Sequence, residues 1–344
     1  MENIDTQNKK DFNLGEFLLN YALYIILGLL IVVIILIRPD FLNLTNFTNI
    51  LTQASTRGIL ALGIAGMIVL GGTDLSAGRI VGSCAALTAS LVQSITYASR
   101  MYPQLEQDLP IILPLLGSIL IAIAFCCLNG FGVAFLNLHA FIATLGTQLI
   151  AFGVTCLYIN SQAGGAQALS SFNSTFLNAV NGGFMSGSFK FPYLVLYFIA
   201  SAVVMWVIWN KTTLGKNMFA IGGNKEAAAV SGVSVRSNIM GIYIVAGVLY
   251  GVASFLEAGR IQSVNTGTGL NYDLDAISGC VIGGVSFSGG VGTIPGVVIG
   301  VVILQVINYG LSFLGVDAYW QYIIKGIIVI LAVSIDVRKY ISKK

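Results

Sequence analysis

Long apolar stretches alternate with short polar segments along this chain. A helix needs about 20 mostly apolar residues to cross the hydrocarbon core of a bilayer. The pattern therefore predicts an all-α, polytopic membrane protein with about ten spans, and a count of eight to eleven stays open. The predicted spans are residues 17–37, 57–72, 80–95, 110–136, 141–159, 191–209, 238–257, 274–285, 292–314 and 320–335. The second, third and eighth are short and glycine-rich, which favours tilted or broken helices.

Composition supports a membrane domain. Hydrophobic residues make up 56% of the 344 residues, charged residues 9%, and the mean hydropathy is +0.87. Soluble domains carry about 25% charged residues, so this chain has too little polar surface to be covered by water. We divide it into a polar N-terminal segment 1–16, a transmembrane domain 17–336 and a basic tail 337–344.

Charge and cysteine usage exclude two classes of ligand. The net charge is +3 and the basic residues sit at helix ends rather than in one patch, so we predict no nucleic-acid binding. The five cysteines lie in apolar stretches without metal-ligand spacing, and we expect small core residues and no metal site.

Lysine and arginine are enriched in cytoplasmic loops, and this bias sets orientation. If six spans precede the basic segment 211–237, that segment falls on the same side as both chain ends. This side then holds 11 of the 17 basic residues. We therefore predict that both termini and segment 211–237 are cytoplasmic. The loop 160–190 on the other side is long and nearly uncharged, and either receives an outside partner or is a solvated connection.

Segment 211–237 is the most polar part of this apolar chain and contains a Glu-Ala-Ala-Ala run. Asn224 is expected to cap a short helix that begins at Lys225, and Gly232 to end it. A short stiff helix outside the lipid can dock on a soluble protein and pass rigid-body motion to the flanking spans, whereas the alternative is an ordinary connection. The residues assigned to this coupling element are Gly222, Gly223, Asn224, Lys225, Glu226, Ala227, Ala228, Ala229, Ser231 and Gly232.

Two of the glycine-rich stretches, residues 71–78 and 283–290, share the frame GGxxxSxG. Internal repeats are common in transporters, but coincidence among 40 glycines is equally compatible with the pattern. Neither stretch is a phosphate-binding P-loop, and Gly215-Lys216-Asn217 lacks the Ser or Thr that such a loop requires. We therefore expect no bound cofactor, and any ATP that drives this protein must be bound by another chain.

Polar residues inside the predicted spans are candidates for a passage or gate, since a neutral polyol would be handled by such groups; helix–helix hydrogen bonding is the alternative. These candidates are Asp74, Ser76, Asn129, Gln148, Gln305 and Asn308. For Asp74 we favour capping of the following helix.

The other intramembrane charges have structural interpretations. Glu257 and Arg260, spaced i, i+3, are expected to pair, and Lys325 to extend toward the membrane surface. Asp273 and Asp275 suit a helix N-terminus. The single histidine, His139, sits in a turn. No convergent set of catalytic groups is present, so we predict no enzymatic activity.

At these motifs the chain resembles the permease subunits of bacterial ATP-binding-cassette importers for monosaccharides, the ribose/xylose/galactose group. The resemblance is carried by residues 71–78, 144–146, 215–232 and 283–293, and it covers most of the chain. Within the group, residues 72–79, 256–261 and 319–326 are similar to the galactose/methyl galactoside subfamily.

The resemblance implies a bacterial inner-membrane importer made of several chains. Two permease copies form the pathway as a homodimer, a cytoplasmic ATPase docks around residues 224–232, and a periplasmic sugar-binding protein delivers the sugar. ATP binding in the partner then drives alternating access. An ion-coupled secondary sugar transporter is the main alternative, followed by a membrane enzyme and a passive channel.

Overall fold

The computed structural model describes residues 14–162, 165–186 and 189–341. The N-terminal segment up to residue 13 and the last three residues, which include Lys9, Lys10, Lys343 and Lys344, lie outside these ranges. The helices are α1 (Leu14–Ile37), α2 (Leu44–Val69), α3 (Ala77–Leu91), α4 (Ile112–Ala134), α5 (Ala140–Asn160), α6 (Ser174–Asn181), α7 (Tyr193–Lys211), α8 (Thr213–Gly223), α9 (Lys225–Val230), α10 (Val235–Ile261), α11 (Tyr272–Ile282), α12 (Ile294–Phe313) and α13 (Ala318–Ile341). A 3-10 turn, Pro39–Phe41, joins α1 to α2.

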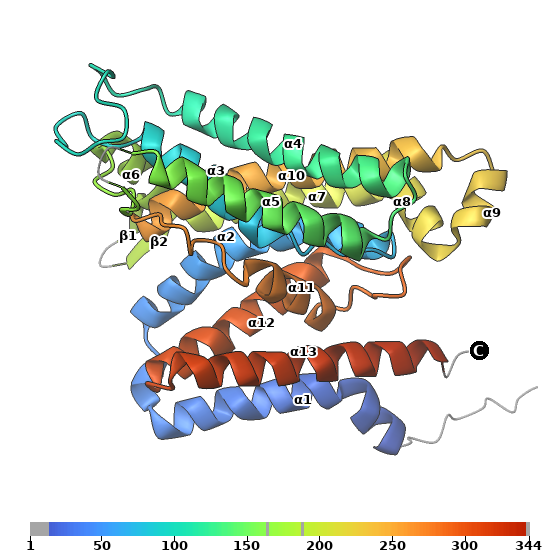
Figure 1. Ribbon diagram of the computed structural model, residues 1–344. Helices are drawn as coiled ribbons and strands as arrows, with labels where there is room; N and C mark the ends of the chain where they lie inside the picture. Colours follow the sequence, from blue (N-terminus) through green and yellow to red (C-terminus); the bar gives the residue numbers. More distant parts are fainter. Residues whose placement is uncertain (1–13, 163–164, 187–188, 342–344) are drawn as a thin grey trace, which may run out of the picture.

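The helices run roughly parallel to one long axis and stack in layers. Figure 1 shows α3, α4, α5, α7 and α10 in the thickest layer, α11 and α12 below it, and α1 beside α13 on the opposite face. Helix α2 passes through the middle and contacts α7, α10, α11 and α12. It is buried along most of its length for this reason.

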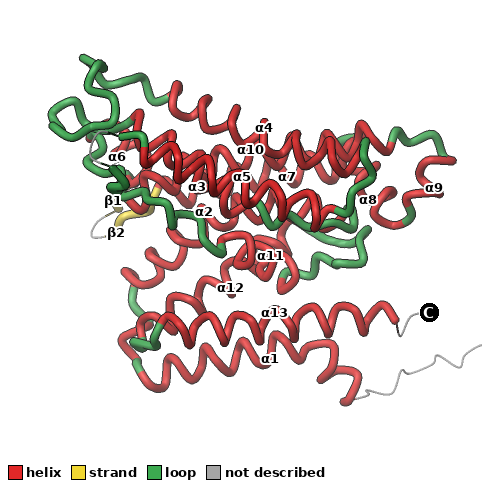
Figure 2. The backbone as a smooth tube through the Cα atoms, in the orientation of Figure 1, coloured by secondary structure: helices red, strands yellow, loops and turns green. Residues whose placement is uncertain are grey.

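The two ends of the bundle differ in character. Helices α8 and α9 lie at one end together with the start of α1 and the end of α13. The loop that precedes α4 lies at the other end with α6 and the strands β1 (Gly183–Ser186) and β2 (Phe189–Pro192), and Figure 2 shows how much of that end is loop. The described parts of both termini and the basic segment therefore share one end of the bundle, as the charge pattern requires.

Each predicted span corresponds to one observed helix. Five helices, α4, α5, α7, α10 and α12, are long and apolar enough to cross a membrane by length and composition among the described residues. The total of ten spans stays a prediction. Helix α2 begins at Leu44, well before the predicted start at residue 57, because Asn43 accepts a hydrogen bond from the Asn46 backbone N–H and caps it.

One feature departs from the all-α prediction: strands β1 and β2 form an antiparallel hairpin with Gly183 paired to Pro192. Helix α8 is an additional helix that the sequence did not predict, and Gly222 and Gly223 form its end.

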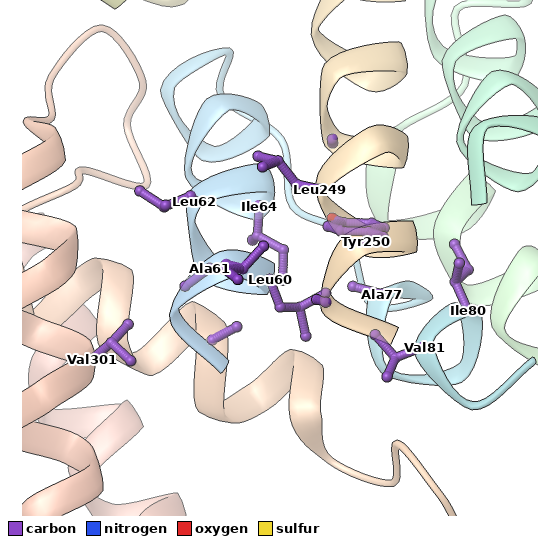
Figure 3. Packing of buried hydrophobic residues seen from close by; sticks show 14 of the residues in the cluster. Leu60, Ala61, Leu62, Ile64, Ala77, Ile80, Val81, Leu249, Tyr250 and Val301 are labelled. Atoms are coloured by element: carbon purple, nitrogen blue, oxygen red, sulfur yellow. The ribbon is translucent and has the colours of Figure 1, made fainter. Parts of the chain in front are cut away.

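Small residues set the distances between helices. Gly247 and Gly251 on α10 face the backbone of α4, where a Cβ on Gly247 would stand 2.8 Å from the Ile123 Cα. On α2, a Cβ on Gly63 would stand 2.8 Å from the Tyr250 ring, and Figure 3 shows Tyr250 lying against this part of α2. The glycines at four-residue spacing thus bring helices of one bundle into close contact.

Candidate functional site

Helix α9 forms as its local sequence predicts. The Asn224 Oδ1 atom accepts a hydrogen bond from the Ala227 backbone N–H at 2.8 Å, which satisfies one free donor of the first turn. At the other end Gly232 adopts φ = +85°, and the Val233 N–H reaches back to the Ala228 carbonyl at 3.0 Å. Glycine takes this left-handed conformation without steric cost.

The exposed face of α9 is small and mixed in character. Lys225, Glu226, Ala227 and Ala229 are exposed, whereas Ala228 is 5% exposed and packs inward. Val230 is 91% exposed, the largest value among the exposed large hydrophobic residues of the described chain. Val230 lies outside the coupling set predicted from the sequence, although it is the one branched apolar side chain on this short helix.

Helix α8 anchors α9 to the bundle. The Thr212 Oγ1 atom accepts a hydrogen bond from the Gly215 N–H at 3.3 Å and caps α8. Met218 is fully buried in the main core. The Asn217 side chain donates to the Asn238 side chain of α10 at 3.1 Å. Helix α9 is therefore a short capped rod held between α8 and α10.

Three of the predicted passage residues form one buried polar group, although the Asn129 Oδ1 atom has no hydrogen-bond partner in the described structure. The Asp74 Oδ1 atom accepts hydrogen bonds from the backbone N–H and the hydroxyl of Ser76, and Oδ2 accepts from the Tyr250 hydroxyl at 3.1 Å. The Asn129 Nδ2 atom donates to the Ser76 hydroxyl at 2.9 Å. Asp74 and Ser76 are fully buried. The group thus holds the α2–α3 break against α4 and α10, with Asp74 bonding the backbone at the start of α3.

The other predicted passage residues lie elsewhere. Gln305 on α12 donates to the Gln53 side chain of α2 at 2.7 Å. Asn308, one turn further along α12, is 7% exposed, and neither its Oδ1 nor its Nδ2 has a hydrogen-bond partner in the described structure. Gln148 is half-buried on α5 and belongs to neither group.

A chain of ion pairs links α2, α11 and α13. Asp275, in the first turn of α11, pairs with Arg57 of α2 at 3.0 Å and with Lys325 of α13 at 2.9 Å. The prediction that Lys325 extends toward the membrane surface is wrong, because its ammonium group has an acidic partner within the bundle. The Asp275 side chain is only 8% exposed.

A second buried carboxylate lies beside this chain. The predicted pair of Glu257 and Arg260 is confirmed, with an N–O distance of 2.6 Å. Glu257 also accepts hydrogen bonds from the Thr56 hydroxyl at 2.7 Å and the Tyr272 hydroxyl at 2.6 Å. The Arg57 guanidinium lies 4.1 Å from the centre of the Tyr272 ring. The two carboxylates are therefore joined through Arg57 and Tyr272.

The register of α11 on α12 brings these charges to the level of Gln305, about one turn before Asn308. A Cβ on Gly283 would stand 2.8 Å from the Val297 N atom, and one on Gly279 would stand 2.6 Å from Val301. The helices thus run antiparallel, and one further turn on each brings Asp275 to the level of Gln305. Polar side chains from α2, α11, α12 and α13 consequently lie at neighbouring levels: Gln53, Arg57, Asp275, Gln305 and Lys325, with Asn308 about one turn beyond Gln305 on α12. We call these six residues the polar cluster.

Comparisons with known proteins agree with a polytopic membrane protein of the permease type. Residues 46–333 match the model of a family described as branched-chain amino acid transport system / permease component. The galactose/methyl galactoside import permease protein MglC of Haemophilus influenzae is 48% identical over 338 residues, 98% of this chain and 99% of that protein. The protein of the same name from Escherichia coli is 49% identical over 337 residues, 98% and 99% of the two chains. The ribose import permease protein RbsC of Bacillus subtilis is 34% identical over 318 residues, 91% and 92% of the two chains. No solved structure matches the chain.

Proposed function

Because the chain belongs to the family of branched-chain amino acid transport system permease components, we propose that it is the membrane-spanning subunit of an ATP-driven importer of galactose and methyl galactoside. It is a multi-pass protein of the bacterial inner membrane. The observation that carries the sugar assignment is the identity of 48% over nearly the full length of both chains with a permease named for these sugars.

The energy for transport comes from a partner chain in this proposal. The sequence contains no P-loop, and α9 offers a cytoplasmic ATPase a rigid, capped contact at one end of the bundle. A periplasmic binding protein delivers sugar at the opposite end, and a second copy of this chain completes the pathway as a homodimer in the lipid bilayer. The chain itself catalyses no covalent step and binds no cofactor.

Reconstitution tests this proposal directly. The purified chain in vesicles should show no ATP hydrolysis and no galactose accumulation. Both should appear when an ATPase subunit and a galactose-binding protein of the same importer are added. An imposed proton or sodium gradient should have no effect on uptake. Gradient-driven accumulation by the chain alone would contradict the proposal and support an ion-coupled carrier.

Replacing Val230 by glutamate should weaken ATPase docking by about tenfold or more. The substitution places a charge where a 91% exposed apolar side chain is available to enter a groove of the partner, and desolvating an unpaired charge in an interface is costly. Pull-down of the ATPase and vesicle uptake measure the effect. Thr213→Glu is the matched control, because it adds the same charge to an exposed position of α8 away from α9. Equal ATPase binding by both variants would show that α9 is not part of the docking site.

We also propose that the polar cluster lies on the route of the sugar. Amide and charged groups from four helices can replace water at the hydroxyls of a hexose, and Asn308 retains a free donor and a free acceptor among the described residues. Intramembrane ionisable groups mark substrate routes more often than lipid-facing surfaces. The group of Asp74, Ser76 and Asn129, whose members hydrogen-bond one another, serves as a gate at the α2–α3 break in this proposal.

A further inference from the structure

Three pairs of glycines from distant parts of the sequence meet at the end of the bundle that carries α9. Gly71 and Gly72 follow α2, Gly222 and Gly223 end α8, and Gly289 and Gly290 lie in the loop between α11 and α12. The glycine junction is the contact between Gly71, Gly222, Gly223, Gly289 and Gly290; Gly72 lies next to it, and a Cβ there would meet Ala140. Its glycines come from both GGxxxSxG stretches and from the segment that leads into α9.

The contacts within the junction are between backbones. The Gly290 N–H donates to the Val69 carbonyl, the last of α2, at 2.8 Å. A Cβ on Gly222 would overlap that same carbonyl oxygen and stand 2.7 Å from the Gly290 N atom. A Cβ on Gly289 would stand 2.6 Å from the Gly222 carbonyl oxygen. No flexible side chain lies between α8 and its two neighbours at these points.

The two GGxxxSxG stretches also share a local geometry. After α2, Gly71 has φ = +82° and the Gly72 N–H bonds to the Met67 carbonyl at 3.0 Å. After α11, Gly284 has φ = +83° and the Val285 N–H bonds to the Cys280 carbonyl at 2.9 Å. Both stretches therefore end a helix with the same left-handed cap, with Gly71 equivalent to Gly284 instead of Gly283.

Each stretch leads to a polar group of the membrane interior. The residues after Gly72 include Asp74, whose carboxylate bonds Ser76 and Tyr250. The loop 283–293 joins α11, which carries Asp275 at its other end, to α12, which carries Gln305 and Asn308. The two helix breaks are the α2–α3 connection and the α11–α12 loop, and α8 contacts both at the junction through backbone atoms. Since a backbone contact cannot be relieved by a change of rotamer, a displacement of α8 moves both connections together.

We propose that Gly222, together with Gly289 and Gly290, positions the two helix breaks according to the state of the ATPase, and so couples nucleotide turnover to sugar movement. The proposal rests on the proposed function, since it requires α9 to be moved by a partner. Gly222 is a positioning residue in this scheme and touches no sugar. A purely structural role for the same glycines predicts effects on assembly alone.

The neighbouring glycines 222 and 223 provide a matched pair of variants. A Cβ on Gly223 meets no atom within 4 Å in the described structure, whereas one on Gly222 overlaps backbone. Both lie in the same helical turn of α8, so Gly222→Ala and Gly223→Ala change helix propensity by the same amount. A difference between the two variants therefore reports the contact at the junction.

The experiment measures galactose uptake per ATP hydrolysed in vesicles that hold the complete importer. Gly223 belongs to the predicted coupling set, so ATPase binding is measured for both variants; because a Cβ on Gly223 meets no atom of the junction, uptake per ATP hydrolysed by Gly223→Ala should lie within twofold of the wild type even where docking is weakened. Gly222→Ala should bind the ATPase and hydrolyse ATP, but uptake per ATP should fall at least tenfold. An unchanged ratio in Gly222→Ala would overturn the proposal while leaving the proposed function intact. Absence of ATP-driven galactose uptake in the wild type would instead overturn the proposed function.

Hydrogen exchange on the wild-type complex decides the matter if Gly222→Ala does not assemble. Addition of a non-hydrolysable ATP analogue should change the exchange rate of the Gly72 and Gly290 amides together with those of α8 and α9. If the exchange rates change only in α9 and its connections, and those of the Gly72 and Gly290 amides do not, the proposal is overturned.

Discussion

Replacing Asp275 by alanine should lower the stability of the folded membrane domain by about 3–5 kcal/mol, the cost of leaving buried charges without their partner. Asp275 holds the Arg57 guanidinium at 3.0 Å and the Lys325 ammonium at 2.9 Å, and its own side chain is 8% exposed. Without this carboxylate, α2, α11 and α13 bring together two largely buried cations that have lost their acidic partner. Thermal unfolding of the purified protein in detergent measures the loss.

Two further variants separate charge from packing. Asp273→Asn, two residues away in the same helical turn, should cost much less, because Asp273 has no ion pair in the described structure. The triple variant Arg57→Leu, Asp275→Leu, Lys325→Leu should recover most of the lost stability, since a whole buried ionic group can be exchanged for apolar residues at little cost. A triple variant as unstable as Asp275→Ala would show that volume and shape dominate at this site.

The local features of the coupling element were readable from the sequence. Asn224, the Glu-Ala-Ala-Ala run and Gly232 act within one short helix, and their cap and termination follow from neighbouring residues alone. The Glu257–Arg260 pair was predictable for the same reason, because three residues on one helix fix its distance. Long apolar stretches likewise placed the helices.

Contacts between distant segments could not be predicted from the sequence. The pairing of Lys325 with Asp275 depends on how α13 packs against α11, which no local pattern specifies. The sequence predicted a span that begins at Arg57, because the residues before it are too polar for the first turns of α2 to be recognised as part of a span. The convergence of Gly71, Gly222 and Gly289 is a property of three-dimensional packing, although the repeated glycine frame drew attention to two of them.

Replacing Asn308 by leucine should raise the stability of the protein and reduce its transport activity. A buried amide with no partner costs about 1–3 kcal/mol, and both polar atoms of the Asn308 side chain are in this state in the described structure. Leucine fills a similar volume without that cost. If the amide bonds a sugar hydroxyl during passage, its loss removes about 0.5–1.5 kcal/mol, which corresponds to about a twofold to tenfold fall in uptake at low sugar concentration.

Asn308→Leu is informative because stability should rise while sugar uptake should fall. Ile307→Leu is the matched control, since Ile307 precedes Asn308 on α12, is 1% exposed, and changes only in shape. It should leave uptake unchanged and stability nearly so. If the Asn308→Leu protein is more stable and keeps wild-type uptake, Asn308 does not contact the sugar during transport. A less stable one would mean that the amide is already paired within the folded protein, and would contradict its role as a free sugar ligand. A buried amide whose two polar atoms have no partner in the described structure calls for one, and in the proposed route that partner is the transported sugar.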